Sequence, residues 1–82
     1  MLRIQRFVSG EFVIFALSGR IETENLTQLE ALITADLERA VLDLKEVNLV
    51  SREVVIFLAR CEDKGIRIQN CPACIREWIA SE

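Results

Sequence analysis

The sequence contains no histidine and no tyrosine, and its 82 residues include only three glycines and one proline. Histidine is the commonest general base and a frequent zinc ligand, so its absence removes the usual starting point for many catalytic sites. No run approaches the roughly 18 consecutive apolar residues of a membrane span. The first residues, MLRIQRFVSGEF, also lack the long apolar centre of a secretion signal. We therefore expect a soluble, cytoplasmic domain that does not insert into membranes.

Charged residues are present but do not form blocks. Ten basic and thirteen acidic residues leave a net charge of −3, and no basic stripe of the kind that binds nucleic acid is visible. Three cysteines are an odd number, and without a secretory context a disulfide framework is not expected. The length predicts a single domain over residues 1–82.

Apolar patterning predicts seven elements in the order β-β-α-β-α-β-α. The expected strands cover 2–8, 12–17, 40–44 and 66–69. The first expected helix carries Leu26, Leu29, Leu32 and Ile33 on one face and ends at about 36–39, and the other helices cover about 51–64 and from 72 onward. Residues 18–20 would close the second strand, and 47–50 would be a bridge to the second helix. Successive β-α units predict a mixed, mostly parallel sheet in an α/β domain, with the helices mainly on one face.

Particular residues support these boundaries. Thr23 or Asn25 can cap the first helix and Ser51 can cap the second, since hydroxyl and amide side chains accept hydrogen bonds from free backbone N–H groups. Leu37 is expected to pack beneath the connection after the first helix. Trp78 is expected to anchor the last helix on the sheet.

Four segments, in this order and spacing, resemble the STAS domain, which is found in sulfate transporters and anti-sigma factor antagonists. They are FALSGRIETENLTQLEALI (15–33), AVLDLKEVNLVS (40–51), FLARCEDKGIRIQN (57–70) and CPACIREWI (71–79). The resemblance covers nearly the whole chain and places Asp43 at the family's aspartate position. It implies a minimal STAS-like domain, because the family often adds a further strand and helix.

The phosphorylation motif of the family is altered in this chain. Where anti-sigma factor antagonists have Asp-Ser-Ser-Gly, this sequence has Ser51-Arg52-Glu53-Val54, so Arg52 stands at the phospho-acceptor position. Arginine cannot accept phosphate, and its charge is opposite to that of phosphoserine. The resemblance therefore implies a domain without the family's serine switch. Ser51 is kept as a candidate for a displaced phosphorylation site, since a helix N-terminus accommodates phosphate.

The resemblance also implies a protein-binding surface at the start of the second helix and the loop after the second strand. Its candidate residues are Ser51, Arg52, Glu53, Glu22 and Glu24. The plainer interpretation is that Ser51 is a helix cap and that the carboxylates complement helix dipoles on solvated loops. Under the binding interpretation, Arg52 offers a bidentate fork to a carboxylate of the partner.

Cys71-Pro72-Ala73-Cys74 is a second candidate site. A C-x-x-C pair at the start of a helix is where redox dithiols occur, and it also supplies half of a tetrahedral zinc site. A lone pair of this kind is weak evidence, because cysteine is also a common buried residue. We favour packing over redox or metal chemistry for Cys71 and Cys74, and expect no cofactor.

The resulting hypothesis is a non-catalytic protein–protein interaction module in bacterial signalling and transcription regulation. Its partner would be an anti-sigma kinase-like protein or, if the chain is the small cytoplasmic subunit of a lipid transporter, a transporter ATPase. The alternatives are a thiol redox or metal-binding protein that uses Cys71 and Cys74, and a homodimer formed by pairing of the first strand, an edge candidate with only Arg3 and Arg6 to oppose pairing.

Overall fold

The computed structural model describes residues 1–82 and contains the predicted elements in the predicted order. The strands are β1 (Leu2–Ser9), β2 (Phe12–Ile21), β3 (Ala40–Val50) and β4 (Arg67–Gln69). The helices are α1 (Leu26–Ala35), α2 (Arg52–Asp63) and α3 (Ala73–Ala80), and a 3-10 turn, η1 (Thr23–Asn25), precedes α1.

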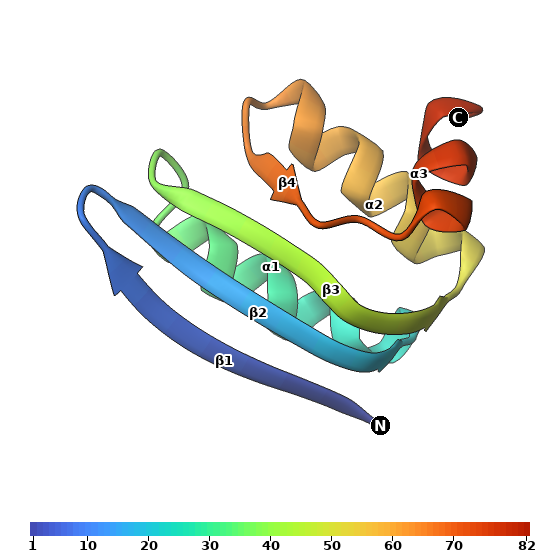
Figure 1. Cartoon of the computed structure of the whole chain (residues 1–82), viewed down its shortest axis with the longest axis horizontal. Coiled ribbons are helices and arrows are strands. Elements are labelled where there is room, and N and C mark those ends of the chain that lie inside the picture. Colours follow the sequence, from blue (N-terminus) through green and yellow to red (C-terminus); the bar gives the residue numbers. More distant parts are fainter.

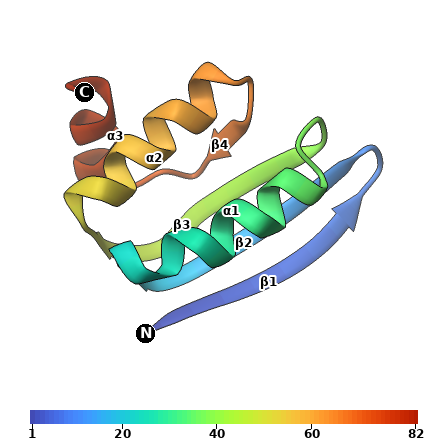
Figure 2. The same cartoon turned by 180° about the vertical axis from the view of Figure 1, so that it is seen from behind.

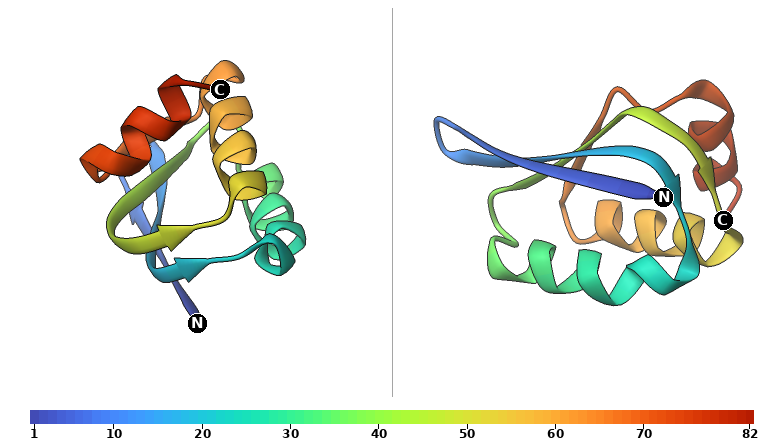
Figure 3. Two further views of the ribbon diagram at one scale, coloured as in Figure 1. Left: turned by 90° about the vertical axis from the view of Figure 1, so that its right-hand side faces the viewer. Right: turned by 90° about the horizontal axis from the view of Figure 1, so that it is seen from below.

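The four strands form one sheet in the order β1-β2-β3-β4 (Figure 1). β1 and β2 are antiparallel, whereas β2–β3 and β3–β4 are parallel. Both parallel connections cross over in the same direction along the sheet, so right-handed crossovers place α1 and α2 on the same face. Figures 2 and 3 show this arrangement, with α3 beside α2. The predicted mixed α/β sheet with helices mainly on one face is confirmed.

The core lies between the sheet and the two crossover helices. Eighteen buried residues form one apolar cluster, and no polar or charged side chain is buried. β2 alternates, because Val13, Phe15 and Leu17 are buried while the residues between them are only partly covered. This pattern shows that β2 has one face on the core and one face toward the uncovered side of the sheet.

The uncovered face of the sheet carries its own apolar row. Phe7, Ile14, Val41 and Arg67 are aligned across the four strands by the pairing register. Val41 is 3% exposed, yet it lies outside the main core cluster. The guanidinium of Arg67 lies 5.2 Å from the centre of the Phe12 ring, which is cation–π distance.

β2 and β3 are longer than predicted. β2 continues through residues 18–20 to Ile21, and the expected bridge at 47–50 is the last part of β3. The apolar pattern breaks at Lys45-Glu46 because β3 makes two register shifts against β2, each adding a residue on the β3 side. The backbone N–H of Lys45 donates to Asp43 Oδ1 at 3.0 Å within this irregular stretch.

Two apolar residues lie at places that differ from the predictions. Leu37 is 43% exposed and does not pack beneath the connection, and Trp78 is 38% exposed rather than an anchor on the sheet. α3 is held instead by the buried Ile75 and Ile79, because these residues lie four apart on one side of the helix. Trp78 lies one residue before Ile79 and therefore turns toward solvent.

Gly19 has a structural role in the β1–β2 pair. Its backbone has φ of +91°, a conformation that glycine adopts more readily than any other residue. A Cβ added there would overlap the carbonyl oxygen of Met1, next to β1. Gly10, in the hairpin turn, also has positive φ, at +58°, but a Cβ there would meet no atom.

We predict that Gly19→Ala destabilises the fold more than Gly10→Ala does. The turn variant carries only the left-handed backbone cost of about 1–2 kcal/mol. The Gly19 variant adds a steric overlap with the Met1 carbonyl oxygen that costs about 1–3 kcal/mol more. Urea unfolding of the two variants measures the difference, and equal losses would show that β1 moves away from Gly19 without cost.

Candidate functional site

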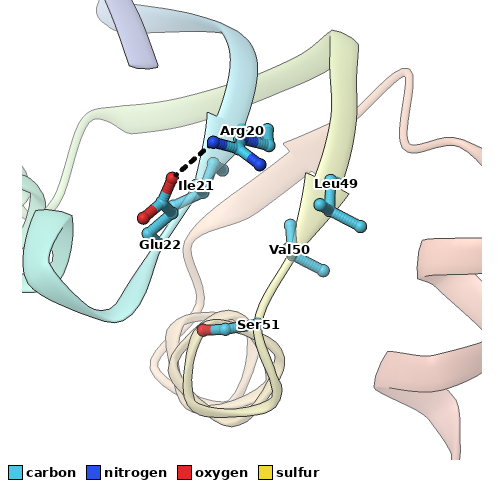
Figure 4. Close-up of a pocket in the computed structure, with 6 residues that line it drawn as sticks. All are labelled: Arg20, Ile21, Glu22, Leu49, Val50 and Ser51. Carbon is cyan, nitrogen blue, oxygen red and sulfur yellow. Dashed lines mark ion pairs between the residues drawn. The ribbon is translucent and has the colours of Figure 1, made fainter. Parts of the chain in front are cut away.

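The candidate site lies where the carboxyl ends of β2 and β3 meet the start of α2. These strands are parallel, so their ends lie at the same edge of the sheet, which is where ligands and partners of α/β folds commonly bind. An open hollow of about 230 Å³ occurs there (Figure 4). The hollow is lined by Arg20, Ile21, Glu22, Leu49, Val50 and Ser51.

Ser51 is the N-cap of α2, as predicted. It has extended backbone angles, and its Oγ accepts a hydrogen bond from the Val54 N–H at 3.3 Å. Such a bond satisfies one of the four free N–H groups of a helix start. The plainer interpretation of Ser51 is therefore confirmed, although capping does not exclude contact with a partner.

Thr23 joins the two loops of the site. Its Oγ1 lies 3.0 Å from Ser51 Oγ and donates to Glu53 Oε1 at 2.9 Å. The sequence suggested Thr23 only as a possible cap of α1, and the contact with residues 28 and 30 positions away was missed. No local signal in the sequence reveals this contact, because it depends on the pairing of Ile21 with Val50, which places the residues following both strands side by side.

Glu22 and Glu24 occupy the β2 side of the site. Glu22 forms an ion pair with Arg20 at 3.3 Å, and both side chains are about half exposed. Glu22 also forms a capping box with Asn25, whose Oδ1 accepts from the Glu22 N–H at 2.9 Å. A hydrogen bond with Glu22, with the repulsion of its carboxylate, raises the pKa of Glu24. The two carboxylates are thus neighbours on an open surface.

Two exposed side chains project from the β3 side of the site. Arg52, the first residue of α2, is exposed and forms no ion pair within the chain. Leu49 is 53% exposed beside the hollow. Leu49 was missed in the sequence because the second register shift in β3, between Val47 and Leu49, turns it away from the core.

Asp43 is separate from this site. Its carboxylate accepts hydrogen bonds from Asn70 Nδ2 at 3.3 Å to each oxygen, in addition to the Lys45 N–H. Asn70 has a positive φ of 54° and begins the loop between β4 and α3. Asp43 thus ties that loop to the centre of the sheet, and it is not brought together with Glu22 or Glu24.

All three cysteines are free thiols. Burial raises the pKa of Cys61 from its ordinary value of 9.0 to about 11, and burial also raises the pKa of Cys71. A redox dithiol needs the opposite shift in its attacking thiol. Cys74 is exposed in the first turn of α3, and no group of three or more cysteine or acidic side chains is gathered in a metal-binding arrangement.

The comparisons with known proteins identify the fold. No protein-family model matches the chain, and no curated protein matches its sequence. Among solved structures it resembles an uncharacterized protein of the DUF3478 family, with a SpoIIAA-like fold, from Shewanella loihica PV-4. The TM-score is 0.56 at 19% identity, over 82% of this chain and 64% of that one. This chain has a SpoIIAA-like fold.

The SpoIIAA-like fold confirms the fold that the STAS resemblance implied. At 19% identity the similarity concerns the fold alone, and the chain spans less than two thirds of the Shewanella protein. None of the three helices combines the length and apolar character needed to cross a membrane.

We predict that Thr23 and Glu53 contribute jointly to stability. Thr23→Val removes the hydroxyl bonded to both loops, at an expected cost of about 0.5–1.5 kcal/mol. Glu53→Gln keeps an oxygen acceptor and should cost less. Because Thr23 donates a hydrogen bond to Glu53, a double-mutant cycle in urea should give a coupling energy of about 0.5 kcal/mol or more between Thr23→Val and Glu53→Ala. Full additivity would mean that the bond makes no net contribution.

The thiols should differ in reactivity. At mildly alkaline pH a disulfide reagent should modify Cys74 first, Cys71 more slowly and Cys61 only after unfolding. Because the pKa of Cys61 is higher in the folded state than in the unfolded state, the contribution of this thiol to stability is fully present below pH 9 and is lost as the pH rises through about 11. Timed mass spectrometry measures the order of modification, and rapid reaction of Cys71 at neutral pH would contradict it.

Proposed function

We propose that this SpoIIAA-like domain is a non-catalytic protein-interaction module in bacterial regulation. The observation that carries the proposal is the surface made by Leu49, Arg52 and the Arg20–Glu22 ion pair at the end of β3 and the start of α2. Arginine is one of the residue types enriched in binding hot spots, and the exposed Leu49 adds apolar area beside the charged Arg20–Glu22 pair.

The residues at this surface suit recognition better than catalysis. The hydroxyls of Thr23 and Ser51 are engaged with Glu53 and with the α2 backbone, and no histidine is available to activate them as nucleophiles. Arg52 has no partner within the chain, so its five N–H donors are free for a carboxylate of another protein.

The proposed partner is an anti-sigma kinase-like protein or, in the alternative setting, the ATPase of a lipid transporter for which this chain is the small subunit. This domain would act on either partner simply by binding to it in a one-to-one complex. Phosphorylation would not control that binding, since the STAS resemblance aligns Arg52 with the family's phospho-acceptor. Ser51 remains only a candidate for a displaced phosphorylation site, and its Oγ is already the cap acceptor for Val54 N–H and a neighbour of Thr23 Oγ1. Phosphate there would have to displace the contact with Thr23.

The raised thiol pKa values give no support to the redox alternative. Cys71 would be the attacking thiol of the C-x-x-C pair, and burial disfavours its thiolate. We therefore do not propose a second function.

Affinity capture from native bacterial lysate, followed by mass spectrometry, tests the proposal. We predict that wild-type protein retains a kinase-like or ATPase partner and that Arg52→Glu and Leu49→Asp each weaken retention about tenfold or more, the loss typical of a hot-spot residue. The matched control is Arg60→Glu, which makes the same charge change on an exposed residue later in α2.

Circular dichroism and thermal melting must show that the variants remain folded. Retention lost in Arg52→Glu but kept in Arg60→Glu would support the surface. Equal retention by all forms, or equal loss in Arg52→Glu and Arg60→Glu, would contradict it, because the partner would then bind elsewhere or respond only to net charge.

A further inference from the structure

The outer edge of β1 is the longest unpaired backbone edge in the protein. β1 has eight residues and pairs only with β2, whereas β4, the other edge strand, has three (Figure 1). Natural edge strands are usually protected by charged side chains, especially lysine, or by proline, bulges or covering segments. β1 contains no lysine or proline, its only charged residues are Arg3 and Arg6, and its pairing with β2 has no register shift.

Exposed apolar side chains concentrate at the same edge. Of the seven large apolar side chains left exposed, four lie on the β1–β2 hairpin or at its start: Met1, Phe7, Val8 and Phe12. Phe7 is 52% exposed on the uncovered face and Val8 is 61% exposed on the helix face. An incoming strand would therefore gain apolar contacts on both faces as well as backbone hydrogen bonds.

We propose that β1 is a homodimerisation strand, which pairs in an antiparallel manner with β1 of a second copy around a two-fold axis at Gln5. The two four-stranded sheets would then join into one continuous sheet. The surface proposed for a partner protein, made by Leu49, Arg52 and the Arg20–Glu22 ion pair and called here the β3–α2 surface, does not use the outer edge of β1.

The backbone N–H and C=O groups of β1 that point away from β2 limit the registers in which two β1 strands can pair. The hairpin loop has two residues, Gly10 and Glu11, so the flanking pair of Ser9 and Phe12 is a hydrogen-bonded pair. Because bonding to β2 alternates along the strand, the even-numbered residues from Leu2 to Val8 direct their backbone groups to the outer edge. An antiparallel second copy must pair even residues with even residues.

Two registers allow seven residues of each β1 strand to pair, and the positions of the charged side chains decide between them. A two-fold axis at Arg6 would place the two Arg6 side chains directly opposite each other, which is destabilising. An axis at Gln5 places Gln5 opposite Gln5, Arg6 opposite Ile4 and Arg3 opposite Phe7. In this register no like charges are directly opposite: the two Arg6 side chains are only diagonal neighbours, and each is paired with Asp36 of its own chain.

The Gln5 register also completes two features of the single chain. On the uncovered face, Arg3 of the second copy lies next to Phe7 and extends the row of Phe7, Ile14, Val41 and Arg67, so that a guanidinium ends the apolar row on each side. On the helix face, Leu2 of the second copy meets Val8. Arg6 keeps its ion pair with Asp36 of its own chain, at 3.4 Å.

Site-directed cross-linking tests the register. In a Cys71→Ser, Cys74→Ser background, Gln5→Cys places two thiols in a non-hydrogen-bonded cross-strand pair, with Cα atoms about 4.5 Å apart, within disulfide range. We expect mild oxidation to give a covalent dimer of Gln5→Cys but not of Arg6→Cys. Cross-linking of Arg6→Cys in preference to Gln5→Cys would overturn the register, and cross-linking of neither would overturn the pairing.

Sedimentation equilibrium tests the association without cysteine chemistry. Wild-type protein should reach twice the 9.4 kDa mass of one chain. Gln5→Lys opposes two cations at the axis and should weaken dimerisation about tenfold or more. Gln28→Lys, the same change on the exposed face of α1, should leave it unaltered. A monomeric wild type, or a Gln5→Lys variant that dimerises as the wild type does, would overturn the proposal.

Discussion

The parallel pairing of β2 with β3 is the interaction on which the rest of the structure depends. These two strands bring the most apolar segments of the chain together, and their inward faces supply Phe15, Leu17, Leu42 and Leu44, each at most 2% exposed. A parallel pair requires a crossover, so α1 must lie over the sheet, and the next crossover brings α2 to the same face. β1 and β4 are then additions to the edges of this central pair.

The same pairing creates the candidate site. Ile21 and Val50 are the last paired residues of their strands, so the chain segments that follow them must lie close together. Thr23 therefore meets Ser51 and Glu53. Its hydroxyl contacts Ser51 Oγ and donates to Glu53, and so links the turn before α1 to the start of α2. The two register shifts of β3 direct Leu49 outward at this point, and a strand without them would have a different alternation at its end.

The two proposed interaction surfaces use different physical properties of the molecule. The β3–α2 surface offers side chains to a partner: the exposed Leu49, and Arg52 at the start of α2, whose backbone is already capped by Ser51. The β1 edge presents backbone hydrogen-bonding groups, and the charge of Arg6 chooses the register, because an axis at Arg6 would set the two Arg6 side chains directly opposite each other. Because the surfaces lie on different strands, a dimer formed through β1 would carry two separate copies of the β3–α2 surface. Such a dimer would bind a multivalent partner with increased avidity.

The sequence by itself determined the element order, the fold class and the cap at Ser51, because these depend on apolar periodicity and on local hydrogen bonding. It did not determine the lengths of β2 and β3, since Lys45 and Glu46 interrupt the apolar pattern while the backbone continues to pair. It also did not reveal the outward turn of Leu49 or Trp78, or the contact of Thr23 with Glu53. Those features were decided by the tertiary structure, because register shifts and long-range strand pairing, rather than any local signal, set which side chains meet and which face solvent.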